Sequence, residues 1–494
     1  MSDARRLVDK LWSYCNVLRD DGVGTLEYTE QLTYLLFLKM AHERATRKVR
    51  PEKIVPDEYS WQRLLDADGV QLEVEYTRIL IGLARQDGVL GTIFRKAQNR
   101  IQDPAKLKRL IHDLIDAEQW SQTGVDIKGD AYESLLSKGA EDIKSGAGQY
   151  FTPRPLIQAM VDCLDPTIDD TITDPAAGTG GFLLAAHEHV AAGAAGFDPS
   201  QRAKLRNGLV HGIELVDGTA RLAAMNLLLH GIGDADGASP IEVKDSLIAH
   251  PGRYWSVVLS NPPFGRKSSI TMVGADGRQA REDGEIERQD FLVTTANKQL
   301  NFLQHIMTIM ETPGRAAVVL PDNVLFEGGA GETLRKRLLK DFDLHTMLRL
   351  PTGIFYAQGV KANVLFFDRK PANTDRPWTQ KLWVYDLRTN QHFTLKQNPL
   401  TRAHLDDFVD SYLVGKARSE RVESERFKAF TYDELVARDK TNLDITWLRD
   451  ESLEDLDNLP APEVIAREIV EDLTAALAEF EAVAAALEAG ATAE

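Results

Sequence analysis

The chain has 494 residues, 43% of them apolar, which predicts one large domain or two to three ordinary domains with buried cores. It has no apolar run of about 18 residues and no signal-peptide pattern, so we expect neither a membrane span nor secretion. Its two cysteines lack a C-x-x-C spacing and its eleven histidines show no metal-ligand clustering. These features predict a cytoplasmic protein with no disulfide framework and no metal site.

The net charge of −17 argues against strong unaided binding to nucleic acid. This charge is uneven along the chain. Residues 451–494 hold twelve Asp or Glu and one Arg, so this tail accounts for −11 of the total. The remaining 450 residues carry only −6, which leaves the body of the protein free to present a local basic face.

Residues 1–143 predict a helical N-terminal domain. The stretch LEYTEQLTYLLFLKMAHERA spaces its apolar residues at helical intervals, and DPAKLKRLIHDLIDAEQW does the same after an Asp-Pro start. No series of alternating strands occurs here, which favours an all-helical packing domain.

The pattern changes at residue 144, and residues 144–400 predict an α/β domain. A Gly-rich aromatic loop leads into a helix that begins near Pro153 or Pro155. Short apolar runs then alternate with helices, which implies a mostly parallel sheet covered on both faces. Ligands of such sheets bind at the carboxyl ends of the strands, and the Gly, Pro and acidic clusters of this chain fall at such ends.

Three further segments follow from composition. Residues 266–289 are polar and Gly-containing, which predicts either a mobile loop that closes over substrate or disorder. Residues 401–450 predict a helical C-terminal extension. In the acidic tail of residues 451–494, apolar residues from Ile469 to Leu487 repeat every 3.5 positions on average, the seam of a coiled coil. A partner helix would fit this seam, although a helix docked on its own domain is a serious alternative.

A glycine-rich loop, DPAAGTGGFL, separates a short strand from a helix. Its glycines let the backbone approach a ligand closely, and the helix points free amide groups at that ligand. A P-loop would need a Gly-Lys-Ser/Thr ending, and a dinucleotide fingerprint would need Gly or Ala where Leu183 stands. A third option is an amino-acid sulfonium such as S-adenosylmethionine, with its carboxylate at the helix and its ammonium on Asp174. A merely tight turn is the structural alternative. The candidate cofactor-binding residues of this loop are Asp174, Gly178, Thr179, Gly180, Gly181 and Phe182.

Two acidic residues end the next two strands. Glu214, in VHGIEL, can accept hydrogen bonds from both ribose hydroxyls of a nucleotide, whereas its structural alternative is a solvated carboxylate at a helix start. Asp245, in VKDSL, can reach an adenine amino group, and a helix N-cap is its equally plausible alternative. Both residues are therefore candidates for cofactor binding.

The stretch SNPPFG follows the apolar run YWSVVL. The side-chain carbonyl of Asn261 and the backbone carbonyl of Pro262 are two acceptors that can take hydrogen bonds from both protons of an exocyclic amine. Such an amine is a poor nucleophile, and preorganised acceptors favour its pyramidal, reactive form. Phe264 can stack on the ring, which contributes roughly 1–3 kcal/mol for a base. These three residues are the catalytic candidates, and a base in duplex DNA would have to be flipped out to reach them.

Together these motifs resemble the amino-methyltransferases that use S-adenosylmethionine, specifically the DNA adenine type. The order of GAGQYFTPRPL, DPAAGTGGFL and NPPF after a helical domain resembles the modification subunit of type I restriction-modification systems. AAVVLPDNVLFEGG, LRLPTGIFYAQGVKANVLFFDR and RFKAFTYDELVARDKTNLDITWL are similar to this subunit too, so the resemblance covers nearly the whole chain. One departure is Ala177, where the family often has Cys, and this small apolar replacement leaves the expected activity unaffected.

The resemblance implies a Rossmann-like methyltransferase core with a helical N-terminal domain and a C-terminal helical tail. It implies that Phe151 stacks on the cofactor adenine, with Gln149, Tyr150, Thr152 and Pro153 nearby. It also implies adenine methylation in double-stranded DNA, with the recognition sequence read by a specificity subunit that joins two modification subunits. A restriction subunit can join that complex. Delegated recognition would explain how an acidic chain acts on DNA.

Three other functions stay open at this point. The NPPF motif can also serve methylation of a glutamine amide in a protein, although such enzymes are similar only in the core. Cytosine-amino methyltransferases usually carry Ser where this chain has Asn261. An inactive scaffold that binds DNA or partners is the non-enzymatic alternative, and the intact motif residues argue against it.

Overall fold

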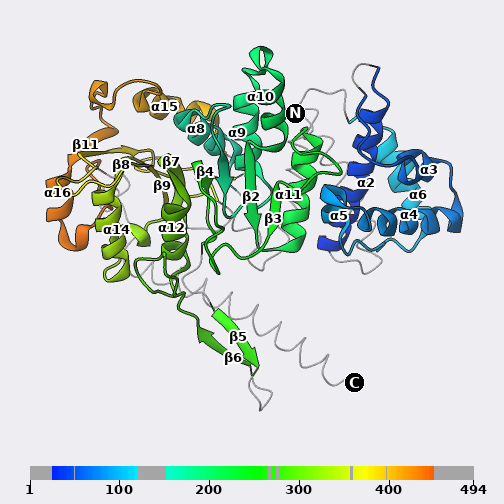
Figure 1. Ribbon diagram of the computed structural model, residues 1–494, viewed down its shortest axis with the longest axis horizontal. Helices are drawn as coiled ribbons and strands as arrows, with labels where there is room; N and C mark the ends of the chain where they lie inside the picture. The colour runs from blue at the N-terminus through cyan, green and yellow to red at the C-terminus, as the bar shows by residue number, and fades with distance from the viewer. Residues whose placement is uncertain are drawn as a thin grey trace, which may run out of the picture. The chain divides into compact units, whose positions relative to one another are not determined.

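The computed structural model describes residues 25–48, 51–120, 152–264, 269–273, 279–355, 360–395 and 398–449. The described elements before residue 121 are all helical, as expected (Figure 1). They are α2 (Thr25–Ala45), η1 (Asp57–Tyr59), α3 (Trp61–Leu65), α4 (Gly69–Ala84), α5 (Gly88–Phe94), α6 (Pro104–Arg109) and η2 (Leu110–Asp116). The Asp-Pro signal is confirmed, because the Asp103 side chain caps α6 by accepting from the Ala105 and Lys106 amides.

The helical domain packs against α11 (Asp217–Leu229), a helix of the α/β domain. Ala224, Met225, Leu228 and Leu229 of α11 belong to the same buried cluster as α2, α4 and α5. Arg44 of α2 adds a hydrogen bond at 3.0 Å to the carbonyl of Leu228, in the last turn of α11. The opposite side of α11 packs next to the glycine-rich loop, so one helix contacts both parts.

The predicted α/β domain contains a nine-stranded sheet in the order β11-β10-β8-β9-β7-β4-β1-β2-β3 (Figure 1). Its strands are β1 (Ile172–Asp174), β2 (Val210–Glu214), β3 (Ile241–Val243), β4 (Trp255–Ser260), β7 (Met310–Pro321), β8 (Phe342–Arg349), β9 (Ala362–Arg369), β10 (Lys381–Asp386) and β11 (Phe427–Thr431). β9 is antiparallel to β7 and β8, β11 is antiparallel to β10, and the other pairs are parallel. The mostly parallel sheet is therefore confirmed.

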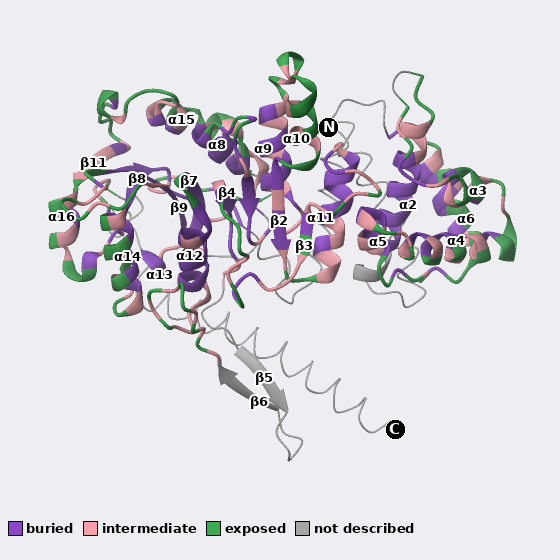
Figure 2. Ribbon diagram, viewed as in Figure 1, coloured by how far each residue is buried: buried purple, intermediate pink, exposed green. Residues whose placement is uncertain are grey.

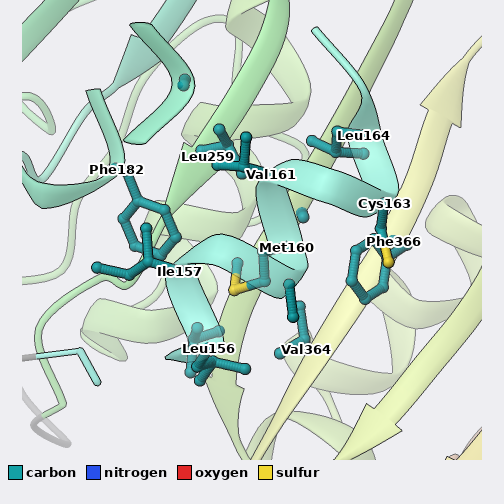
Figure 3. Close-up of a cluster of buried hydrophobic side chains, with 14 of the residues drawn as sticks. Leu156, Ile157, Met160, Val161, Cys163, Leu164, Phe182, Leu259, Val364 and Phe366 are labelled. Atoms are coloured by element: carbon teal, nitrogen blue, oxygen red, sulfur yellow. The ribbon is translucent and has the colours of Figure 1, made fainter. Parts of the chain in front are cut away.

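Helices cover both faces of this sheet. Alternate strand residues such as Leu259, Val364 and Phe366 lie in one cluster with α8 (Arg154–Leu164) and α9 (Gly181–Ala191), as Figure 3 shows. The strands of this sheet are mostly buried (Figure 2). Val258 and Leu365 alternate with Leu259, Val364 and Phe366 and so point to the other face, and they are fully or almost fully buried as well. There α12 (Lys298–Ile309) packs on β7 and α14 (Ala330–Asp341) packs on β8. The remaining helices are α10 (Pro199–Asn207), α13 (Asn323–Phe326), α15 (Asp406–Tyr412) and α16 (Tyr432–Ala437).

Two sequence-based expectations need correction. Part of residues 266–289, expected to be a loop, pairs as an antiparallel hairpin of β5 (Ser269–Val273) and β6 (Gln279–Asp283). The sequence signal was the β-branched content of SITMV, which outweighs the polar composition around it. The extension over residues 401–450 is not only helical, because β11 adds an edge strand to the main sheet. Five residues of FKAFT were too short a run to stand out from the flanking charged sequence.

The expected coiled-coil tail of residues 451–494 lies outside the described residues. Among the helices that are described, none is long and apolar enough to cross a membrane. Within the same described ranges, no three His, Cys, Asp or Glu side chains gather in a group that could hold a metal ion.

Candidate active site

The candidate residues meet at the edge of the sheet where the strand order reverses. From β1 the chain continues outward to β2 and β3, whereas from β4 it continues to β7 on the other side. β1 and β4 are parallel neighbours, so the Gly loop after β1 and the NPPF segment after β4 leave the sheet at the same edge. A crevice at such a switch point is where open α/β sheets bind ligands.

The Gly loop has the backbone conformation that its glycines permit. Gly178 and Gly180 have φ values of +55° and +83°, in the left-handed region that other residues avoid. A Cβ atom on Gly178 would meet nothing within 4 Å, so this part of the loop borders open space that a ligand can occupy. Gly180 caps the 11-residue helix α9, whose first amides point towards the loop.

The carboxylate of Asp174 lies beneath this loop. Asp174 is 1% exposed, and its Oδ1 accepts hydrogen bonds from Ser260 Oγ at 2.7 Å and from the Ala176 amide at 2.9 Å. Burial raises the pKa of Asp174 to about 7, against the opposing effect of these two hydrogen bonds. Asp174 therefore joins the ends of β1 and β4, and its pairing with a ligand ammonium stays a prediction.

Glu214 holds the loop from the end of β2. Its Oε2 accepts from the Gly178 amide at 3.0 Å and its Oε1 from the Val216 amide at 2.8 Å. Burial raises the pKa of Glu214 even though these backbone hydrogen bonds lower it. Asp245 is half-buried and accepts from the Leu247 amide at 2.8 Å, which closes a short turn instead of capping a helix. All three acids thus stand at neighbouring strand ends.

The NPPF segment presents a polar atom with no partner. Asn261 is 6% exposed and its Nδ2 donates to Thr152 Oγ1 at 2.8 Å, whereas its Oδ1 is buried without a hydrogen-bond donor among the described residues. Pro262 is buried too, and Phe264 is half-buried with its ring perpendicular to that of Phe355 at a centroid distance of 5.7 Å. A buried acceptor without a donor indicates a place where a ligand donor binds.

The other candidates divide into three groups. Gln149, Tyr150 and Phe151 lie outside the described residues. Thr179 stays on the loop, where its carbonyl accepts from Asn226 Nδ2 at 3.3 Å, and Gly181 begins α9. Phe182 has its side chain in the core beside Ile157 (Figure 3), 4% exposed, so its role in cofactor binding stays a prediction that rests on its backbone amide.

Sequence reasoning missed two contacts that shape the site. Ser260 ties the catalytic strand to Asp174, and its signal was a hydroxyl directly before Asn261 at a buried strand end. Thr152 contacts Asn261, although the resemblance placed it near the cofactor adenine. Pro153 follows it as the half-buried N-cap of α8. No sequence spacing could have joined Thr152 to a residue 109 positions away.

Comparisons with known proteins identify the family of this chain. The model of the N-6 DNA methylase family matches residues 123–451, and that of the HsdM N-terminal domain matches residues 7–114. The chain is 37% identical to the StySPI type I restriction enzyme methylase subunit of Salmonella potsdam, over 98% of this chain and 96% of that one. It is 36% identical to the EcoKI methylase subunit of Escherichia coli K12, over 96% and 94%.

Solved structures give the same result. A modification subunit of a putative type I restriction enzyme from Vibrio vulnificus is 25% identical with a TM-score of 0.69, covering 88% of this chain and 94% of that chain. The crystal structure of the EcoKI M protein is 34% identical with a TM-score of 0.53, covering 98% and 96%. The chain therefore belongs to the N-6 DNA methylase family, among the methylase subunits of type I restriction-modification systems, and is an adenine-specific DNA methyltransferase.

Proposed function

We propose that the crevice between β1 and β4 transfers a methyl group from S-adenosylmethionine to the exocyclic amino group of a flipped-out adenine in double-stranded DNA. The observation that carries this proposal is the Oδ1 atom of Asn261, which is buried and lacks a donor among the described residues. An amino group supplies the missing donor, whereas a hydroxyl- or carbonyl-bearing substrate would not use two acceptors at once.

The cofactor fits the residues of the neighbouring loop. S-adenosylmethionine supplies an electrophilic methyl group on a sulfonium sulfur. The open space at Gly178 admits a ligand next to the backbone, and the amides that begin α9 suit its carboxylate. Glu214 would accept hydrogen bonds from ribose hydroxyls, and Asp245, one strand further, from the adenine amine. Asp174 would pair with the ammonium.

Asn261 and Pro262 do the chemical work on the substrate side. Asn261 Oδ1 and the Pro262 carbonyl accept the two N–H groups of the adenine amine, which directs the nitrogen lone pair away from them. Phe264 stacks on the base, and the perpendicular ring of Phe355 supports it. Because the acceptors are rigid and buried, they need no reorganisation when the nitrogen becomes tetrahedral. One N–H proton is then lost to solvent.

We also propose that the chain acts in a complex. A specificity subunit would read the DNA sequence, two copies of this chain would join it, and a restriction subunit would complete the assembly. The similarity to methylase subunits of type I restriction enzymes over nearly their full length supports this proposal. A solved type I system studied for complex assembly, 26% identical over 99% of both chains with a TM-score of 0.69, supports it as well.

The test is methyl transfer with the Asn261→Ala variant. Unmodified DNA, methyl-labelled S-adenosylmethionine and a specificity subunit of a type I system are incubated with each variant, and the methylated nucleoside is identified. We expect labelled methyladenine with the wild type, a loss of at least about 100-fold in the variant, and nearly unchanged cofactor binding by calorimetry.

Asn99→Ala is the matched control, since Asn99 is a hydrogen-bonded asparagine of the helical domain. It should keep wild-type turnover. An equal loss of cofactor affinity in Asn261→Ala would contradict the catalytic role of Asn261. Absence of label in DNA with the wild type, despite bound cofactor, would contradict the function itself.

A further inference from the structure

The amide of Asn261 is held from one side only. In the described part of the chain its single hydrogen bond joins Nδ2 to Thr152 Oγ1 at 2.8 Å, and both residues are 6% exposed. Thr152 comes from the segment before α8, whereas Asn261 directly follows β4. The bond therefore connects two segments that approach each other only in the folded chain.

The orientation of this amide decides whether the proposed chemistry is possible. Its two ends are opposite in character, because Oδ1 accepts hydrogen bonds and Nδ2 only donates them. An exocyclic amine presents N–H groups, so it needs Oδ1. If the amide turned by half a rotation, Nδ2 would point its hydrogens at the substrate and the acceptor would be lost.

Thr152 has the properties of a residue that disfavours this rotation. Its hydroxyl accepts the Nδ2 hydrogen, and Oδ1 is unbonded among the described residues. A hydroxyl can also donate, so the Thr152 hydroxyl selects this orientation when its own hydrogen is directed away from Asn261. Its β-branched side chain has few χ1 rotamers, and the following residue, Pro153, restricts its backbone to extended conformations. The acceptor is thus fixed before substrate arrives.

We propose that Thr152 is a positioning residue of the methyl-transfer reaction. It fixes the Asn261 amide with Oδ1 towards the target amine, a role different from the one near the cofactor adenine that the family resemblance implies. This inference rests on the proposed function. It predicts that the Thr152 hydroxyl affects turnover without affecting cofactor affinity.

The experiment compares Thr152→Val with Thr152→Ser in the complex with the specificity subunit. Valine keeps the shape and removes the hydroxyl, so we expect kcat to fall about 10- to 100-fold, the effect of misplacing a catalytic group. Serine keeps the hydroxyl and should restore most of kcat. Cofactor dissociation constants from calorimetry should match the wild type in both variants, and the thermal midpoint of Thr152→Ser should match it too.

Thr173→Val is the matched control. Thr173 is fully buried in β1, and its Oγ1 has no hydrogen-bond partner among the described residues, so the same substitution there should leave kcat unchanged. If Thr152→Val does not fold, Thr152→Ala removes the same hydroxyl with less crowding.

The outcomes separate this inference from the proposed function. A wild-type complex that leaves no label on adenine contradicts the proposed function, whatever the variants do. An active wild type with unchanged kcat in Thr152→Val overturns the positioning role. A rise in cofactor dissociation constant that matches the fall in kcat would assign Thr152 to the cofactor instead. A serine variant as slow as the valine variant would show that side-chain shape, and not the hydroxyl, is what matters.

Discussion

The two halves of the sheet place acidic residues along the same edge, but they surround them differently. At the ends of β1, β2 and β3, Asp174, Glu214 and Asp245 accept hydrogen bonds from amides or a hydroxyl, and no Lys or Arg of the described ranges forms an ion pair with them. After β7 and at the end of β10, Asp322 and Asp386 are held by arginines. The carboxylates of the first half stay available as acceptors for a ligand, whereas those of the second half are already bound by arginines of the same chain.

The pKa values follow this division. Burial raises the pKa of Asp174 to about 7 and also raises that of Glu214. Asp322 is half-buried, and Arg388 binds it through two hydrogen bonds of 2.7 and 2.9 Å and holds its pKa below the usual range. Acidic strand ends alone therefore do not indicate a ligand site, and the absence of a cationic partner is the distinguishing feature.

The largest effect is expected from breaking a pair in the second half. Arg349 binds Asp386 at 2.7 Å, with the two side chains 4% and 0% exposed, and it also contacts Asp444 at 3.1 Å. Arg349→Met removes the cation that pairs with the buried Asp386 carboxylate at 2.7 Å, so we expect a loss of about 3–5 kcal/mol in the free energy of unfolding, measured in urea.

The matched control is Lys53→Met. Lys53 and Asp57 form an ion pair of 2.6 Å whose side chains are 57% and 88% exposed, and such pairs contribute about 1 kcal/mol or less. If Arg349→Met were no more destabilising than this control, the pairs between arginines and acidic residues at this end of the sheet would not stabilise the fold as inferred.

A smaller effect, on binding instead of stability, is expected in the first half. Glu214→Gln removes a charged acceptor for ribose hydroxyls, so the cofactor dissociation constant should rise about 10- to 100-fold. The free energy of unfolding should change by about 1 kcal/mol or less, because one backbone hydrogen bond is lost while a buried charge is removed. Calorimetry and urea unfolding measure the two quantities.

Asp322→Asn is the reciprocal variant. It weakens the bidentate contact with Arg388, so stability should fall while cofactor affinity stays near that of the wild type. If Asp322→Asn weakens cofactor binding as much as Glu214→Gln does, the claim that only the acidic residues after β1, β2 and β3 bind the cofactor is contradicted.

The sequence was sufficient for the elements with a local signal. The helical spacing of α2, the Asp-Pro start of α6 and the strand runs before Asp174, Glu214 and Asn261 each lie within about twenty residues, and the structure confirms them. The family resemblance was confirmed by the match to the family model and by the similarity to type I methylase subunits. The short strands β5 and β11 were missed because their polar surroundings hide a five-residue run.

Contacts between distant residues could not be read from the sequence. The Asn261–Thr152 hydrogen bond spans 109 positions, and the Ser260–Asp174 bond spans 86. Phe182 has the sequence position of a loop residue, but its side chain turns into the core with Ile157. Which strand-end acids are paired with arginines also depends on tertiary placement, since Arg388 reaches Asp322 across 66 positions.

The pH dependence of cofactor binding tests most directly whether Asp174 pairs with the ammonium group of the cofactor. With a folded pKa of about 7, Asp174 is largely protonated below pH 7 in the cofactor-free chain and must lose a proton before it can pair with an ammonium. Cofactor affinity should therefore fall as pH decreases, by about tenfold from pH 8 to pH 6. Binding at pH 6 should also release a proton, which calorimetry in buffers of different ionisation enthalpy detects.

The raised pKa of Asp174 makes the free energy of unfolding of the cofactor-free chain fall with rising pH, whereas cofactor affinity rises. Because its folded pKa lies above the unfolded value of about 3.9, Asp174 contributes stability at low pH that is lost as pH rises towards 7 and beyond. Asp174→Asn should remove most of the pH dependence of cofactor affinity and of the free energy of unfolding. The pH dependence that remains belongs to Glu214, whose pKa is raised as well. If affinity in the wild type does not vary with pH while Asn261→Ala abolishes turnover, Asp174 serves only to join β1 to Ser260 of β4. The ligand ammonium then has a different partner, and of the two acids at the loop only Glu214 would remain available to the cofactor.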